Sequence, residues 1–169
     1  MTEAMLHPDG RLELRGRIWR AALGRGGVRL LKAEGDGATP AGLLPLRRVL
    51  YRADRVPIPR AAVPREPIGE QDGWCDDAGH PDYNRQVRLP HPARHEELWR
   101  RDGLYDVVGV LGWNDAPVLR GRGSAIFLHV ARPDLAPTEG CVALARADLL
   151  AVLEAGLTGL RVLAPTAPG

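Results

Sequence analysis

SAIFLHVARPDLAPTEGCVAL, residues 124–144, places a histidine at the end of one apolar run and a cysteine at the start of the next. Alternation along the first run puts His129 on one strand face with Phe127, and Leu128 on the other. Because both faces are apolar, we expect a central strand and a partly buried His129. The proline-containing segment 131–138 is long enough to cross over and return a second strand beside the first. This stretch therefore predicts that Cys141 opens a strand next to that of His129.

The rest of the chain favours a β-rich fold. Its 20 glycines and 15 prolines among 169 residues suit many short elements and turns. Residues 53–94 form a long irregular segment, and 165–169 a flexible tail. The fold class is predicted as mainly β with a few short helices (α+β), in a single domain over residues 1–164. The expected strands cover 11–23 (two strands and a turn), 44–52, 104–113, 124–130, 141–144 and 160–164, and the expected helices cover 91–103 and 146–156.

Composition and known motifs exclude several classes of protein. A net charge of +2 with scattered basic residues argues against nucleic-acid binding. The N-terminus lacks the basic and apolar regions of a signal peptide, and no apolar stretch approaches about 20 residues, so we expect a cytoplasmic protein with no membrane contact. Ser124, the only serine, is not in a G-x-S-x-G motif. His91 and His95 have zinc-like spacing but no third ligand, so neither a metal nor a cofactor is expected.

Cys141 and His129 point to catalysis. Each alone has a structural interpretation, as a buried small apolar residue and as a core histidine bonded to a backbone carbonyl. Together they predict a thiol whose pKa is lowered by a neighbouring imidazole. Gly140 lets the backbone approach a substrate, and the amides near Gly140 and Cys141 would stabilise an oxyanion by about 3 kcal/mol per donor. Cys75, in the irregular segment, is at least as consistent with packing as with function.

These residues resemble the active-site signature of the L,D-transpeptidase (YkuD) family. T-E-G-C-V (138–142) after F-L-H-V (127–130) is similar to its histidine followed by Ser/Thr-x-Gly-Cys. KAEGDGATPAG (32–42) resembles the family's K-x-G-D-x-x-T-P-x-G segment, and the resemblance spans roughly residues 10–163. It departs at Glu139, where many members carry histidine, and at Ala143, where many carry arginine.

The resemblance implies a YkuD-like curved β-sheet or sandwich and a peptidoglycan stem peptide as substrate. Cys141 would be the nucleophile and His129 its base and later proton donor, with the Val130 carbonyl orienting the imidazole. The thiolate would attack the carbonyl of the third residue, commonly a diamino acid, and expel terminal D-alanine. Water or an amine would then resolve the thioester. The expected substrate contacts are Thr138, Glu139 and Arg132, with Tyr83 and Asn84 as a cap or wall; Arg146 and Arg85 are further candidates for a carboxylate contact.

Three functions remain open from the sequence. The first is an L,D-carboxypeptidase that releases D-alanine from muropeptides recycled from the cell wall. The second is an exported L,D-transpeptidase that forms peptidoglycan cross-links. The third is a non-catalytic domain that only binds muropeptides.

Overall fold

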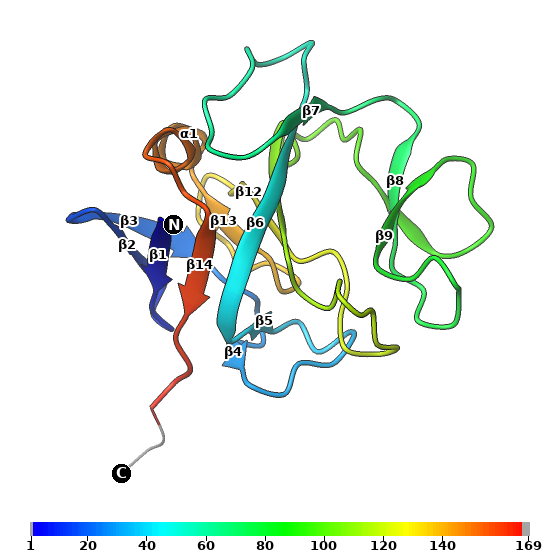
Figure 1. The fold of residues 1–169 in the computed structure, drawn as a ribbon, viewed down its shortest axis with the longest axis horizontal. Helices are drawn as coiled ribbons and strands as arrows, with labels where there is room; N and C mark the ends of the chain where they lie inside the picture. The colour runs from blue at the N-terminus through cyan, green and yellow to red at the C-terminus, as the bar shows by residue number, and fades with distance from the viewer. Residues whose placement is uncertain (1, 167–169) are drawn as a thin grey trace.

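The computed structural model describes residues 2–166, which form a mainly β structure (Figure 1), so the predicted fold class is confirmed. Residues 167–169 of the predicted flexible tail lie outside the described residues. The strands are β1 Glu3–Leu6, β2 Arg11–Leu14, β3 Arg17–Ala22, β4 Val28–Arg29, β5 Thr39–Pro40, β6 Gly42–Tyr51, β7 Arg65–Pro67, β8 Asp72–Cys75, β9 Arg85–Arg88, β10 His95–Glu97, β11 Val107–Leu111, β12 Phe127–Val130, β13 Val142–Leu144 and β14 Gly159–Val162, with helix α1 at Arg146–Glu154.

The main sheet curls until its ends meet. Its order is β11-β12-β13-β3-β2-β1-β14-β6-β7, and β6 also pairs with β11. Strand β6 pairs with two different strands along its length: residues 42–45 pair with β14, and residues 46–51 pair with β11. The result is a barrel-like sandwich in which β12 is central, as its apolar faces predict.

Alternation along β12 and β13 separates two apolar cores. Leu128 and Val142 belong to a large cluster that also contains Leu153 of α1. Phe127 belongs to a smaller cluster on the opposite face, where it packs against Trp74 with ring centroids 5.0 Å apart. The sheet that carries the candidate site is therefore supported from both sides.

Local sequence accounts for the best-predicted elements. The β2–β3 hairpin turns at Arg15 and Gly16, both with positive φ, as a two-residue type I′ turn requires. Helix α1 buries Leu149, Val152 and Leu153 at helical spacing. Each of these side chains contributes about 1.5–3 kcal/mol by leaving water.

Among residues 2–166, no helix has the length and apolar character needed to cross a membrane.

The helix predicted over 91–103 is wrong. Residues 95–97 instead form β10, which pairs with β8 in the small sheet β10-β8-β9. Only Leu98 and Trp99 are strongly apolar in that stretch, too few for a helical apolar stripe. Figure 1 shows β8 and β9 standing to one side of the barrel, and Trp74 of β8 packs in the smaller core beside the site.

Candidate active site

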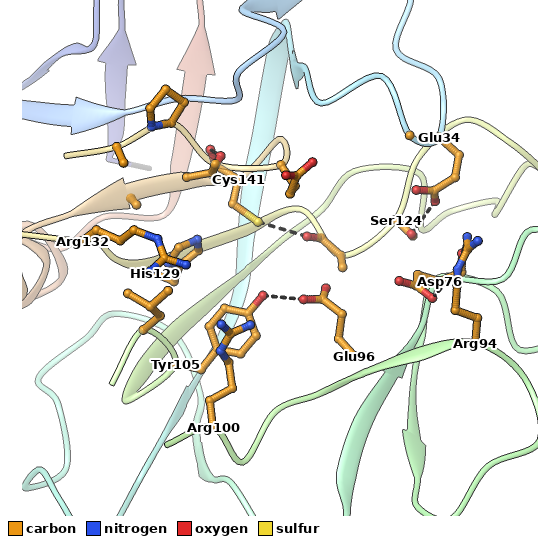
Figure 2. Close-up of a pocket in the computed structure, with 18 residues that line it drawn as sticks. Glu34, Asp76, Arg94, Glu96, Arg100, Tyr105, Ser124, His129, Arg132 and Cys141 are labelled. Atoms are coloured by element: carbon orange, nitrogen blue, oxygen red, sulfur yellow. Dashed lines mark hydrogen bonds and ion pairs between the residues drawn. The ribbon is translucent and has the colours of Figure 1, made fainter. Parts of the chain in front are cut away.

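The parallel register of β12 and β13 brings the histidine and cysteine onto one face. Leu128 pairs with Val142 and His129 with Ala143, so Cys141 stands opposite Phe127. Directly paired residues of neighbouring strands point to the same side, which makes His129 and Cys141 diagonal neighbours on that face. Both line a pocket of about 640 Å³. Figure 2 shows them among the side chains that line it.

His129 is held in the tautomer that a general base needs. Its Nδ1 lies 2.9 Å from the Val130 carbonyl oxygen. Because a carbonyl only accepts, Nδ1 carries the proton and Nε2 keeps a free lone pair. Burial lowers the pKa of His129 from its usual value, which keeps the ring neutral near pH 7.

Cys141 is a protonated thiol in the free protein. Its sulfur donates to the Ala125 carbonyl at 3.2 Å and accepts from the Phe127 N–H at 3.4 Å, its hydrogen bonds among the described residues. Burial, followed by the charge of Glu96, raises the pKa of Cys141 to about 12. The predicted lowering of this pKa by the imidazole is therefore wrong for the free protein.

The backbone before Cys141 is clamped by Thr138. Its Oγ1 donates to the Cys141 carbonyl at 2.7 Å and accepts from the Gly140 N–H at 3.1 Å. That amide is therefore engaged, which corrects the prediction that it stabilises an oxyanion. Gly140 has φ +134°, and a Cβ there would lie 2.8 Å from the Ala38 carbonyl oxygen. Glycine is thus required by both conformation and space.

The KAEGDGATPAG segment supports this clamp from the other side. Thr39 is fully buried, and its Oγ1 donates to the Gly140 carbonyl at 3.0 Å while accepting from the Gly24 N–H at 2.9 Å. Lys32 forms a buried ion pair with Asp36 at 2.5 Å. Asp36 also accepts from the backbone N–H groups at positions 33 and 38, which fixes the loop that reaches the pocket.

The structure places the predicted substrate contacts in two groups. Arg132, Thr138 and Glu139 line the pocket. Tyr83 and Asn84 are buried behind its wall instead: Tyr83 donates to Glu34 at 2.7 Å, and Asn84 accepts from the Trp74 indole at 2.9 Å.

The two further arginine candidates do not reach the pocket. Arg146 pairs with Asp106, and Arg85 lines a separate, smaller pocket. The carboxylate contact proposed to replace an arginine at position 143 is thus left to Arg132 among the three candidates.

Several pocket residues escaped sequence reasoning. Tyr105 packs edge-on to the His129 ring, with centroids 5.3 Å apart, and donates to Glu96 at 2.8 Å. Arg100 lies over the Tyr105 ring, 4.9 Å from its centroid. Glu34 was within reach of prediction because it lies in the family-like 32–42 segment, whereas Glu96 was hidden in the stretch misassigned as a helix.

A histidine cluster lies outside the pocket. His80, Asp82 and His91 bring ligand atoms within 4.8 Å of one another. The Nδ1 atoms of both histidines accept backbone N–H groups, at 3.0 and 3.2 Å, so each neutral ring carries its proton on Nε2. His91 Nε2 then donates to Asp82 at 2.9 Å. The lone pair of each ring therefore already accepts a hydrogen bond and is not free to bind a metal. We interpret the cluster as a structural one.

Comparison with known proteins identifies related sequences at the family level. The model of the YkuD family, the L,D-transpeptidase catalytic domain, matches residues 3–163. No curated protein matches the chain. Among solved structures, the chain is similar to Mycobacterium tuberculosis L,D-transpeptidase 1, with 10% identity and a TM-score of 0.41. The alignment covers 96% of this chain and 62% of that one.

Proposed function

Because the chain belongs to the YkuD family of L,D-transpeptidase catalytic domains, we propose that it is an L,D-carboxypeptidase of peptidoglycan recycling. Its substrate is a muropeptide with a tetrapeptide stem, from which it releases terminal D-alanine with water as the acyl acceptor. The observation that supports this best is Arg132, which lines the pocket with His129 and Cys141 and has no carboxylate partner among residues 2–166. A free guanidinium suits a peptide's terminal carboxylate.

The first half-reaction forms a thioester. As the substrate carbonyl reaches Cys141, the proton on Sγ passes to His129 Nε2, and the sulfur attacks the carbonyl carbon of the third residue. His129 then returns the proton to the departing amine of D-alanine as the C–N bond breaks. The Val130 carbonyl holds Nδ1–H throughout, so the ring keeps its orientation when it becomes an imidazolium.

The second half-reaction is hydrolysis. Neutral His129 takes a proton from water, which attacks the thioester carbonyl and displaces the Cys141 thiolate. The thiolate regains the proton from the imidazolium, and the shortened peptide leaves. The buried resting thiol limits side reactions between catalytic cycles, because only the thiolate is strongly nucleophilic.

We also propose a cytoplasmic location. Cys75 and Cys141 are both free and buried, which is compatible with the reducing conditions in which recycled muropeptides are processed. Cell fractionation with an antibody against the native protein tests this, and recovery in the periplasm or the cell wall would contradict it.

The activity is tested with a purified tetrapeptide muropeptide. D-Alanine release that is abolished by Cys141→Ala supports the proposal, whereas cross-linked dimers or D-amino-acid exchange would favour a transpeptidase. No turnover, with unchanged binding in Cys141→Ala, would favour a binding domain.

The role of Arg132 has its own control. Arg132→Gln should reduce kcat/KM for the free-acid tetrapeptide about tenfold or more, the effect expected for one charge-assisted pair. A peptide with a C-terminal amide should lose much less. Arg120→Gln, which removes an exposed arginine outside the pocket, is the matched control. Equal losses on the acid and the amide would contradict the role of Arg132.

A further inference from the structure

A second pocket, of about 300 Å³, lies between the main sheet and the small sheet β10-β8-β9. Strands β6 and β11 line it from the main sheet, and strands β8 and β9 line it from the small sheet. Arg48 of β6 joins the two sheets there by donating a hydrogen bond to the side-chain oxygen of Gln86 in β9. Among the described residues, none lines both this pocket and the catalytic one, so the second pocket is a separate cavity.

The positive charges of the second pocket are only partly matched. Arg47 is paired with Asp115 through hydrogen bonds of 3.0 and 3.2 Å. Arg85 forms no ion pair with any of the described residues. Arg48 lies 3.9 Å from Glu66, and its buried Nε–H has no hydrogen-bond partner in the described part of the chain. Two guanidinium groups are therefore available to an anion.

The remaining lining is largely apolar. It consists of two tryptophans and four aliphatic side chains: Trp74, Trp113, Val110, Leu111, Val118 and Ile126. The side chain of Asn84 also lines the pocket, but it already accepts from the Trp74 indole at 2.9 Å and donates to the Trp113 carbonyl at 2.9 Å. A ligand that fits this surface therefore combines an anionic group for the arginines with an apolar body for the tryptophans and aliphatic side chains.

The chain at residues 125 and 126 separates the two pockets. Ala125 lines the catalytic pocket, where its carbonyl accepts from the Cys141 thiol at 3.2 Å, and Ile126 lines the second pocket. The two cavities therefore lie on opposite sides of this segment. Each has its own arginine without an ion pair, Arg132 in the catalytic pocket and Arg85 in the second pocket.

We propose that the second pocket binds a small organic anion, in which a phosphate or carboxylate group is attached to an apolar or aromatic body. The oxyanion pairs with Arg85 and Arg48, because a planar guanidinium matches two oxygens of one anionic group. The body packs against Trp113 and the aliphatic side chains beside it. This site does not depend on the proposed carboxypeptidase activity, and no step of that reaction takes place in it.

Isothermal titration calorimetry at low ionic strength tests the site with four probes. Phenyl phosphate and benzoate carry an anionic group on an aromatic body, inorganic phosphate carries the charge alone, and benzyl alcohol carries the body alone. We expect phenyl phosphate to bind about tenfold or more tightly than inorganic phosphate and benzyl alcohol, since only it uses both parts of the pocket. The affinity for benzoate relative to phenyl phosphate shows which of the two oxyanions the arginines prefer, and tight binding of either supports the site.

Two arginine variants locate the bound anion. Arg85→Gln should weaken the binding of phenyl phosphate about tenfold or more, the effect of one charge-assisted contact. Arg132→Gln, which removes the free arginine of the catalytic pocket, should leave this binding unchanged. Thermal melting verifies that each variant is folded.

Three results would overturn the proposal. The first is phenyl phosphate and benzoate binding no tighter than inorganic phosphate or benzyl alcohol. The second is an affinity for phenyl phosphate that Arg85→Gln leaves unchanged. The third is a loss of binding in Arg132→Gln, which would place the anion in the catalytic pocket.

Discussion

Thr39→Val tests how the 32–42 segment supports the backbone that carries Cys141. Valine has nearly the shape of threonine but removes the hydroxyl that joins the Gly140 carbonyl at 3.0 Å to the Gly24 N–H at 2.9 Å. Thr39 is fully buried, so water cannot replace these bonds without rearrangement. Leaving two buried backbone groups without partners costs about 1–3 kcal/mol each, so we expect a loss of about 2–6 kcal/mol in the free energy of unfolding.

Urea denaturation followed by tryptophan fluorescence measures this loss. Thr39→Ser is the matched control, because it keeps the hydroxyl and removes only a buried methyl group, at a cost of about 1 kcal/mol. We also expect Thr39→Val to lower kcat/KM for D-alanine release, because the Gly140 carbonyl no longer fixes the backbone that carries Cys141. A valine variant within about 0.5 kcal/mol of wild type, or a serine variant less stable than the valine one, would refute this reasoning.

Three further predictions concern the same loop and the thiol. Lys32→Met leaves Asp36 without its buried counter-ion and should destabilise the protein by about 3 kcal/mol; a change below about 1 kcal/mol in chemical denaturation would be the contrary result. Gly140→Ala should lower the melting temperature and abolish turnover, because φ +134° and the crowded Cβ position both exclude alanine; unchanged melting would contradict it. In the free protein, the rate at which iodoacetamide alkylates Cys141 should keep rising above pH 9, because burial raises the pKa of Cys141 to about 12. Cys141 should also react faster than Cys75, which is fully buried. A rate that reaches a plateau near pH 7 would contradict this prediction.

The part of the fold that follows from local pattern was predictable. Alternation in SAIFLHV separates the His129 face from the Leu128 face, and helical spacing marks α1. The stretch 91–103 failed because its conformation depends on pairing with β8, which lies about twenty residues earlier in the chain and contributes no local signal.

The candidate site was predictable in its centre and not at its walls. His129 and Cys141 stand twelve positions apart in a recognisable motif, whereas Glu96 and Tyr105 reach them only through the folding of the small sheet and the start of β11. Tyr83 and Asn84 illustrate the converse, because polar residues in an irregular segment served to hold the pocket wall and not to line the pocket.

Mass spectrometry of the intact protein after rapid acid quenching tests the central claim most directly. Incubation with the tetrapeptide substrate should yield a thioester on Cys141 with the mass of the acyl group that remains after D-alanine departs, and Cys141→Ala should yield no adduct and no D-alanine. An adduct mapped to Cys75, or D-alanine released at an undiminished rate by Cys141→Ala, would contradict a nucleophilic role for Cys141.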